Sequence, residues 1–191
     1  MAVQDSSSPP AVDPRVVRTH DDVLRAALHV LVHEGAQSVT HQHVADVAGY
    51  SKATVYAHWK GRHDLLRGAF TRLVHAPHHV PTGDLRADLV AELTAFRTAL
   101  VHHHLAPALS ALADLTAHVP GMAEVRDQLV VEGEQVIRAL LHPVLCGAER
   151  EAAVRMLSGA VLYSVFLHGR APDDDLIAAS VDLTLRGLDQ T

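Results

Sequence analysis

The apolar residues of this chain recur at helical spacing, and this pattern limits what the chain can fold into. In the first periodic segment Leu24, Ala27, Leu28 and Leu31 fall on one face of a helix. Ala, Leu and Val dominate the composition, no stretch alternates as a half-buried strand does, and no internal repeat occurs. We therefore expect an all-α protein.

Prolines and glycines mark where one helix ends and the next begins. The first helix is expected from about Val16 or Asp21 to His33, with Gly35 as its stop. Thr40 is a suitable N-cap for a short helix that ends near Ala48. Later helices are expected over about 62–74, 85–103, 107–118, 122–141, 149–168 and 173–188.

A tight turn is expected between the second and third helices. Gly49 is free to adopt positive φ, and Ser51 caps the helix that follows it. Two short helices joined in this way form a helix-turn-helix. Its inner residues are expected to be Val44, Ala45, Ala48, Val55 and Trp59.

Charge is distributed unevenly along the chain, although the net charge is −6. Residues 15–75 contain eight Lys and Arg against five Asp and Glu, whereas the remainder beyond residue 75 contains eight against fifteen. A basic first part and an acidic second part indicate two different roles. Eight of the sixteen His residues also lie in the first part.

Residues 18–70 resemble the DNA-binding domain of the TetR family of bacterial one-component regulators. The segments that carry the resemblance are "VLRAALHVLVHEG", "VTHQHVADVAGYSKATVYAHW" and "RHDLL". The positions that fit the family pattern, in order and without gaps, are Gly49, Ser51, Thr54, Tyr56, His58 and Leu65. The positions that depart from it are Leu31, His41, Tyr50, Trp59 and Arg62.

The resemblance implies an N-terminal three-helix helix-turn-helix DNA-binding domain followed by an all-helical ligand-binding and dimerisation domain. We expect a disordered arm over residues 1–14, because these are rich in Ser and Pro. The DNA-binding domain is expected over 15–61, a connecting helix and loop over 62–80, and the second domain over 81–191.

The helix that Ser51 caps is expected to lie in the major groove of double-stranded DNA. Lys52, Ala53 and Ala57 would face the bases, where Lys52 could donate to guanine and Ala53 could touch a thymine methyl group. Candidates for phosphate contacts are Thr40, Ser51, Thr54, Tyr56, His58, Lys60 and Arg62. Plainer alternatives are that Thr40 and Ser51 are only caps, that Tyr56 covers the core, and that the others are solvated.

The many histidines raise the possibility of a metal site. His29 and His33 have i, i+4 spacing, and further groups are 75–79 and 102–104. No Cys, Asp or Glu stands at a tight motif spacing to them, so we predict no metal ligands. The alternative function is a His-rich metal- or small-molecule-binding helical protein with a vestigial DNA-binding head.

Other classes of protein find no support in the sequence. There is no Gly-rich phosphate loop, metalloprotease helix or nucleophile elbow, so we expect neither an enzyme nor a cofactor. Cys146 is alone, which excludes a disulfide framework. No apolar run has membrane-spanning length and the N-terminus lacks a signal pattern, so we expect a cytoplasmic protein without a membrane partner.

The resemblance also implies what the second domain does. We expect a homodimer through roughly residues 149–188, where apolar residues occupy more than one helix face. We expect a repressor that a small hydrophobic ligand releases from a palindromic operator. Candidate residues of the ligand pocket are Leu89, Leu93, Phe96, Leu100, His103, His104, Leu112, Leu115, Met122, Leu129, Tyr163 and Phe166.

Overall fold

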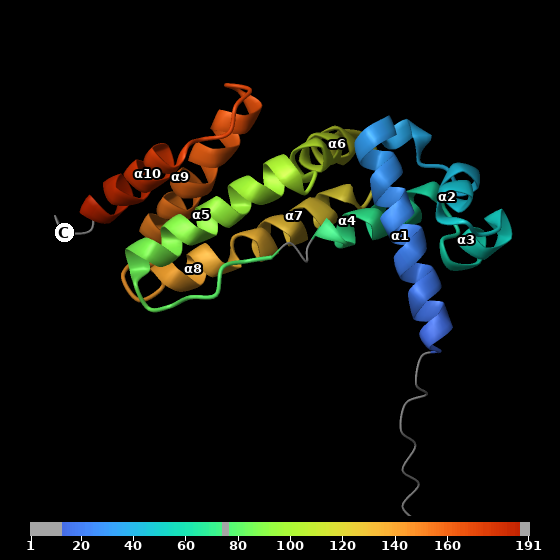
Figure 1. Ribbon diagram of the computed structural model, residues 1–191, viewed down its shortest axis with the longest axis horizontal. Coiled ribbons are helices and arrows are strands. Elements are labelled where there is room, and N and C mark those ends of the chain that lie inside the picture. Colours follow the sequence, from blue (N-terminus) through green and yellow to red (C-terminus); the bar gives the residue numbers. More distant parts are fainter. Residues whose placement is uncertain (1–12, 74–76, 188–191) are drawn as a thin grey trace, which may run out of the picture. The chain divides into compact units, whose positions relative to one another are not determined.

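The computed structural model describes residues 13–73 and 77–187, and these residues form ten α-helices, one 3₁₀ helix and no strand (Figure 1). The prediction of an all-α fold is confirmed. The chain divides into two compact units, Met1–Ala69 and Phe70–Thr191. The arm predicted for residues 1–14 falls mainly on residues outside the described ranges, and the predicted domain bounds stay a prediction.

The first helix, α1 (Pro14–Glu34), begins earlier than the sequence indicated. The side chain of Asp13 caps it by accepting from the backbone N–H of Arg15 at 2.9 Å, and Pro14 suits the first helical position because it needs no backbone donor there. Its buried face includes Val23, Ala27 and Val30.

The rest of the first unit follows the predicted pattern closely. A 3₁₀ helix, η1 (Ala36–Ser38), leads into α2 (His41–Ala48), α3 (Lys52–His58) and α4 (Arg62–Thr71). Gly68 lets α4 approach α1 closely, because a Cβ there would lie 2.7 Å from Leu24 Cδ2 and 3.0 Å from Trp59 Nε1. Leu65 and Leu66 complete this core.

The second unit is a bundle arranged around one long helix, α5 (Leu85–His102). The other helices are α6 (Leu105–His118), α7 (Met122–Gly133), α8 (Gln135–Leu141), α9 (Gly147–Phe166) and α10 (Asp174–Arg186). Helix α5 contacts α6, α8, α9 and α10, and α6 contacts α7 (Figure 1). The core of the second unit includes Leu89, Leu93, Leu112, Ile137, Leu157 and Val181.

Several helix bounds in the second unit differ from the predicted ones. Helix α6 begins at Leu105 and holds Pro107 in its first turn, where a missing backbone donor costs little. The helix predicted over 122–141 is interrupted at Glu134, next to Gly133, whose helix propensity is low. Helices α9 and α10 end two residues short of their predicted bounds, and Val74, the predicted end of α4, lies outside the described residues.

Within the described ranges, no helix combines the length and the apolar content that crossing a membrane requires.

Candidate functional site

Local capping rules build the helix-turn-helix in the first unit. Thr40 Oγ1 accepts from the backbone N–H of His43 at 3.2 Å and so caps α2. Gly49 follows α2 in the left-handed conformation, with φ of 75°, and reverses the chain direction. Ser51 then caps α3, because its Oγ accepts from the backbone N–H of Thr54 at 3.0 Å. The predicted caps and turn are therefore confirmed as structural features.

Helix α3 buries one face and exposes the other. Val55 is fully buried and Trp59, just after the helix, is 6% exposed, so both belong to the core. Lys52, Ala53 and Ala57 are exposed. The predicted base-reading side chains thus share the outward face of a short helix, which is the geometry that a recognition helix needs.

The predicted phosphate-contacting residues lie around this helix. Thr40, Ser51, His58 and Lys60 are exposed, Tyr56 is 51% exposed, and Thr54 and Arg62 are half-buried. The Thr40 hydroxyl oxygen accepts a cap hydrogen bond, which leaves its hydrogen able to donate elsewhere, whereas the Ser51 hydroxyl both caps α3 and pairs with Thr54 Oγ1 at 2.8 Å. That these residues contact DNA stays a prediction.

Tyr56 and its neighbours form a polar rim beside α3. The Lys60 ammonium lies 5.4 Å from the centre of the Tyr56 ring, and the His41 ring lies 5.3 Å from it. At this separation the ammonium is attracted to the face of the aromatic ring. The rim therefore places a phenol hydroxyl and a lysine charge next to the exposed face of α3.

Three residues that depart from the family pattern connect the helix-turn-helix to neighbouring segments by hydrogen bonds. The His41 ring, through Nε2, donates to the Trp59 carbonyl at 2.7 Å, and the Tyr50 hydroxyl donates to Asp22 Oδ2 at 3.0 Å. Arg62 donates from Nε to the Val39 carbonyl at 3.1 Å. Sequence reasoning did not find these contacts, because their partners lie 18 to 28 residues away.

A cavity of about 160 Å³ lies within the second unit, between α5, α6, α7, α8 and α9. Of the twelve predicted pocket residues, Phe96, Leu112 and Leu129 line it. Among the lining residues that the sequence did not indicate are Leu73, His78, Glu92, Arg126, Glu134 and Ile137. The walls are mostly apolar, and the polar side chains come from the segment before α5, from α5, α7 and α9, and from Glu134 between α7 and α8.

The remaining predicted pocket residues do not line this cavity. Leu89, Leu93, Leu100, Leu115 and Met122 are buried in the core instead. On α5 the lining positions are 92, 95, 96 and 99, so residues 89, 93 and 100 point to other faces of the helix.

The four other predicted pocket residues are exposed. His103 and His104 form the link between α5 and α6. Tyr163 and Phe166 lie on the face of α9 opposite to its buried positions Val154, Leu157 and Val161. For Tyr163 and Phe166 the sequence does not show which side faces inward, because α9 is apolar on two faces. That any of these four residues contacts a ligand stays a prediction.

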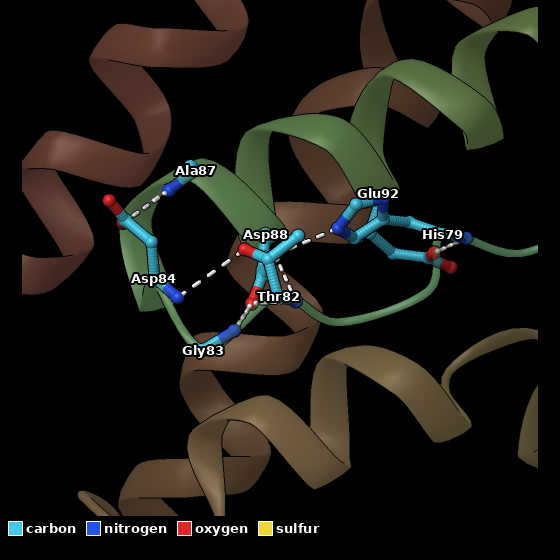
Figure 2. Close-up of polar contacts among 7 residues, drawn as sticks. All are labelled: His79, Thr82, Gly83, Asp84, Ala87, Asp88 and Glu92. Carbon is cyan, nitrogen blue, oxygen red and sulfur yellow. Dashed lines mark hydrogen bonds and ion pairs between the residues drawn. The ribbon is translucent and has the colours of Figure 1, made fainter.

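Two buried carboxylates tie the segment before α5 to that helix (Figure 2). Asp88 is 1% exposed and accepts from His79 Nε2 at 2.8 Å, from the Thr82 hydroxyl at 2.8 Å and from the Gly83 N–H at 2.9 Å. Burial raises the pKa of the Asp88 carboxyl, but the hydrogen bonds from His79, Thr82 and Gly83 together hold it well below its usual range.

Glu92, one turn further along α5, anchors the same segment. Its Oε1 accepts from His78 Nδ1 at 2.7 Å and its Oε2 accepts from the His79 backbone N–H at 2.8 Å. Among the described residues no group of three or more His, Cys, Asp or Glu side chains is placed to hold a metal ion. The histidines of this segment therefore act as partners of carboxylates.

Comparisons with known proteins agree with this geometry. Residues 23–69 match the family described as bacterial regulatory proteins, tetR family. The HTH-type transcriptional regulator Rv1556 of Mycobacterium tuberculosis is 28% identical over 171 residues, covering 84% of this chain and 83% of the relative.

Solved structures share the fold over most of the chain. The TetR family transcription regulator SCO0332 is 26% identical, with a TM-score of 0.65, over 91% of this chain and 98% of that one. A transcriptional regulator from Rhodococcus sp. Rha1 is 18% identical, with a TM-score of 0.71, over 88% and 96% of the two chains. The second similarity concerns the fold alone.

Proposed function

We propose that this chain, whose residues 23–69 match the tetR family, is a DNA-binding transcriptional regulator of that family and acts as a homodimeric repressor. In this proposal two copies bind a palindromic operator, and a small hydrophobic ligand releases them. The observation that carries the DNA-binding part is the outward face of α3, where Lys52, Ala53 and Ala57 are exposed while Val55 is buried. A cytoplasmic location is part of the same proposal.

The dimer is supported by large apolar side chains that the second unit leaves exposed. On α9 they are Met156 and Tyr163, and on α10 they are Leu176 and Leu183, with Met156 and Leu183 62% and 63% exposed. Large exposed apolar side chains on two contacting helices favour association with another surface. A second copy would bury them and would present two recognition helices to successive major grooves, about 34 Å apart.

Release by a ligand is supported by the cavity in the second unit. Its walls are mostly apolar, and they include Leu73, which follows the last residue of α4, Thr71, by two positions. A ligand that changes the position of this wall would act on α4, which continues into the first unit. Release requires the ligand to favour the DNA-incompetent state by about 1–3 kcal/mol or more.

The test is operator binding by fluorescence anisotropy, with duplexes from the DNA that flanks the gene and with a shuffled duplex of equal composition. We expect tight binding only to a flanking duplex, and we expect the affinity to fall with salt. The double variant Lys52→Ala/Tyr56→Phe is expected to bind about tenfold or more weakly, because base and phosphate contacts are lost.

Arg170→Ala is the matched control, since it removes one positive charge from an exposed residue of the second unit that does not line the cavity. It is expected to bind the operator as wild type does. If the double variant bound the operator as tightly as wild type, α3 would not be the recognition helix. The double variant should keep the oligomeric state of wild type in sedimentation experiments.

A further inference from the structure

The polar part of the cavity wall includes a hydrogen-bonded pair, His78 and Glu92. Glu92 is 2% exposed, and both of its oxygens are occupied, one by His78 Nδ1 and one by the His79 backbone N–H. Burying a carboxylate costs less free energy when both of its oxygens accept hydrogen bonds. Glu92 therefore needs no hydrogen bond from a ligand.

The other charged residues of the wall are also paired. The Arg126 guanidinium lies 2.6 Å from Asp127 Oδ1, and Glu134 Oε2 lies 2.6 Å from the Arg138 guanidinium. A charged ligand would bring into the cavity a charge that no free group of the wall compensates, and burying such a charge is costly. The electrostatics of the wall therefore favour an uncharged ligand.

Among the described residues, two uncharged polar groups of the wall remain for a ligand, the Nε2 of His78, whose Nδ1 alone is bonded to Glu92, and the hydroxyl of Ser158 on α9. Because Nδ1 donates to a carboxylate, Nε2 is an acceptor in the neutral ring and a donor in the protonated ring. A hydroxyl group can donate to the first form and accept from the second, so it matches both states. Carbonyl and ether oxygens match only the protonated ring.

We propose that the ligand of this cavity is an uncharged, mostly apolar molecule whose hydroxyl group hydrogen-bonds to His78 Nε2. The cavity of about 160 Å³ suits a single substituted ring, since a dry cavity of about 150 Å³ accepts benzene. The inference rests on the proposed function in one respect, namely that the cavity is where the effector binds.

The test uses p-cresol and p-xylene, which differ only in that a hydroxyl replaces a methyl group. Calorimetry at about pH 8 gives the dissociation constant of each compound. The quantity compared between proteins is the dissociation constant of p-xylene divided by that of p-cresol. In His78→Leu this ratio is expected to fall about tenfold, because the cresol hydroxyl is buried without a partner. The affinity for p-xylene should stay within about threefold of wild type, which shows that the cavity is intact.

The matched control is His79→Leu. His79 also bonds a carboxylate of α5, through Nε2 to Asp88, but it does not line the cavity. This variant should keep the wild-type ratio within about twofold. His78→Gln, whose amide can still donate and accept, should keep most of the preference and provides a second variant if His78→Leu does not fold.

A measurement on wild type alone completes the test. In nitrogen-15 spectra of the histidine rings, p-cresol should shift the Nε2 resonance of His78 and p-xylene should not. An unchanged ratio in His78→Leu, or no such shift, overturns the hydroxyl assignment and leaves the effector cavity standing. If neither compound binds up to its solubility limit, the hydroxyl assignment and the cavity as effector site both fail, while operator binding is tested separately.

Discussion

Arg62 fixes the segment between α1 and α2 to the beginning of α4. Its guanidinium donates from Nε to the Val39 carbonyl at 3.1 Å and from Nη2 to the Ala36 carbonyl. Val39 is fully buried, so its carbonyl depends on a partner within the protein. A planar group with several fixed donors suits two carbonyls better than an ammonium does.

We expect Arg62→Ala to destabilise the first unit by about 1–3 kcal/mol, because the hydrogen bonds from a charged donor to two carbonyls are lost. Urea unfolding followed by the fluorescence of Trp59, the only Trp of the chain, reports on this unit. Lys60→Ala is the control, since Lys60 is exposed and should change the free energy of unfolding by less than about 0.5 kcal/mol. Equal unfolding midpoints for Arg62→Ala and wild type would refute the structural role.

At the scale of elements, a hydrogen-bond network holds the beginning of α5. The segment before the helix folds back onto it and supplies the donors. Asp88 accepts from His79, Thr82 and Gly83, which all precede the helix, and Asp84 caps the helix by accepting from the Ala87 N–H at 2.9 Å (Figure 2). The ionised carboxylate is an acceptor only, and it faces donors only. The network therefore requires a charged Asp88.

We expect Asp88→Asn to lower the thermal midpoint of the second unit at pH 7, because the amide presents donors to the Thr82 and Gly83 N–H groups. The folded pKa of Asp88 is lowered, so its contribution is present above the unfolded pKa of about 3.9 and is lost as pH falls from there towards the folded value. The difference in thermal midpoint between wild type and Asp88→Asn should therefore shrink as the pH falls below about 4. Thermal melts by circular dichroism across pH 3–7 measure the difference.

Asp84→Asn provides the comparison, because asparagine caps a helix about as well as aspartate does. Its thermal midpoint should stay near that of wild type at every pH. A constant difference between Asp88→Asn and wild type from pH 7 down to pH 3 would contradict the pH-dependent role of the carboxylate.

Capping and turn chemistry made the helix-turn-helix predictable from the sequence. Thr40, Gly49 and Ser51 act on neighbours within three residues, so their roles follow from local rules. The residues that line the cavity could not be predicted from the sequence, because α5 and α9 carry apolar residues on more than one face. His78 and Glu92 were not recognised as partners, since they are 14 residues apart and meet only after the segment before α5 folds back.

At the scale of the whole molecule, the proposed repressor needs two copies. The second unit exposes apolar side chains on α9 and α10, helices that contact each other and α5. The same unit fixes α10 to α5 through Arg86, whose Nε and Nη2 donate to the two Asp182 oxygens at 2.6 and 3.0 Å. A firmly held helix that keeps Leu183 63% exposed is a suitable half of an interface.

We expect the double variant Met156→Lys/Leu183→Lys to dissociate the dimer, because two unpaired charges per copy would be buried in the interface. Sedimentation velocity at micromolar concentration should show a monomer, against a dimer for wild type. Val131→Lys is the control, since Val131 is 64% exposed but lies on α7. Because a lone recognition helix contacts only one half-site, the operator affinity of the double variant should fall at least about a hundredfold. A dimeric double variant would place the interface elsewhere, and a monomeric one with unchanged operator affinity would show that one copy suffices for recognition.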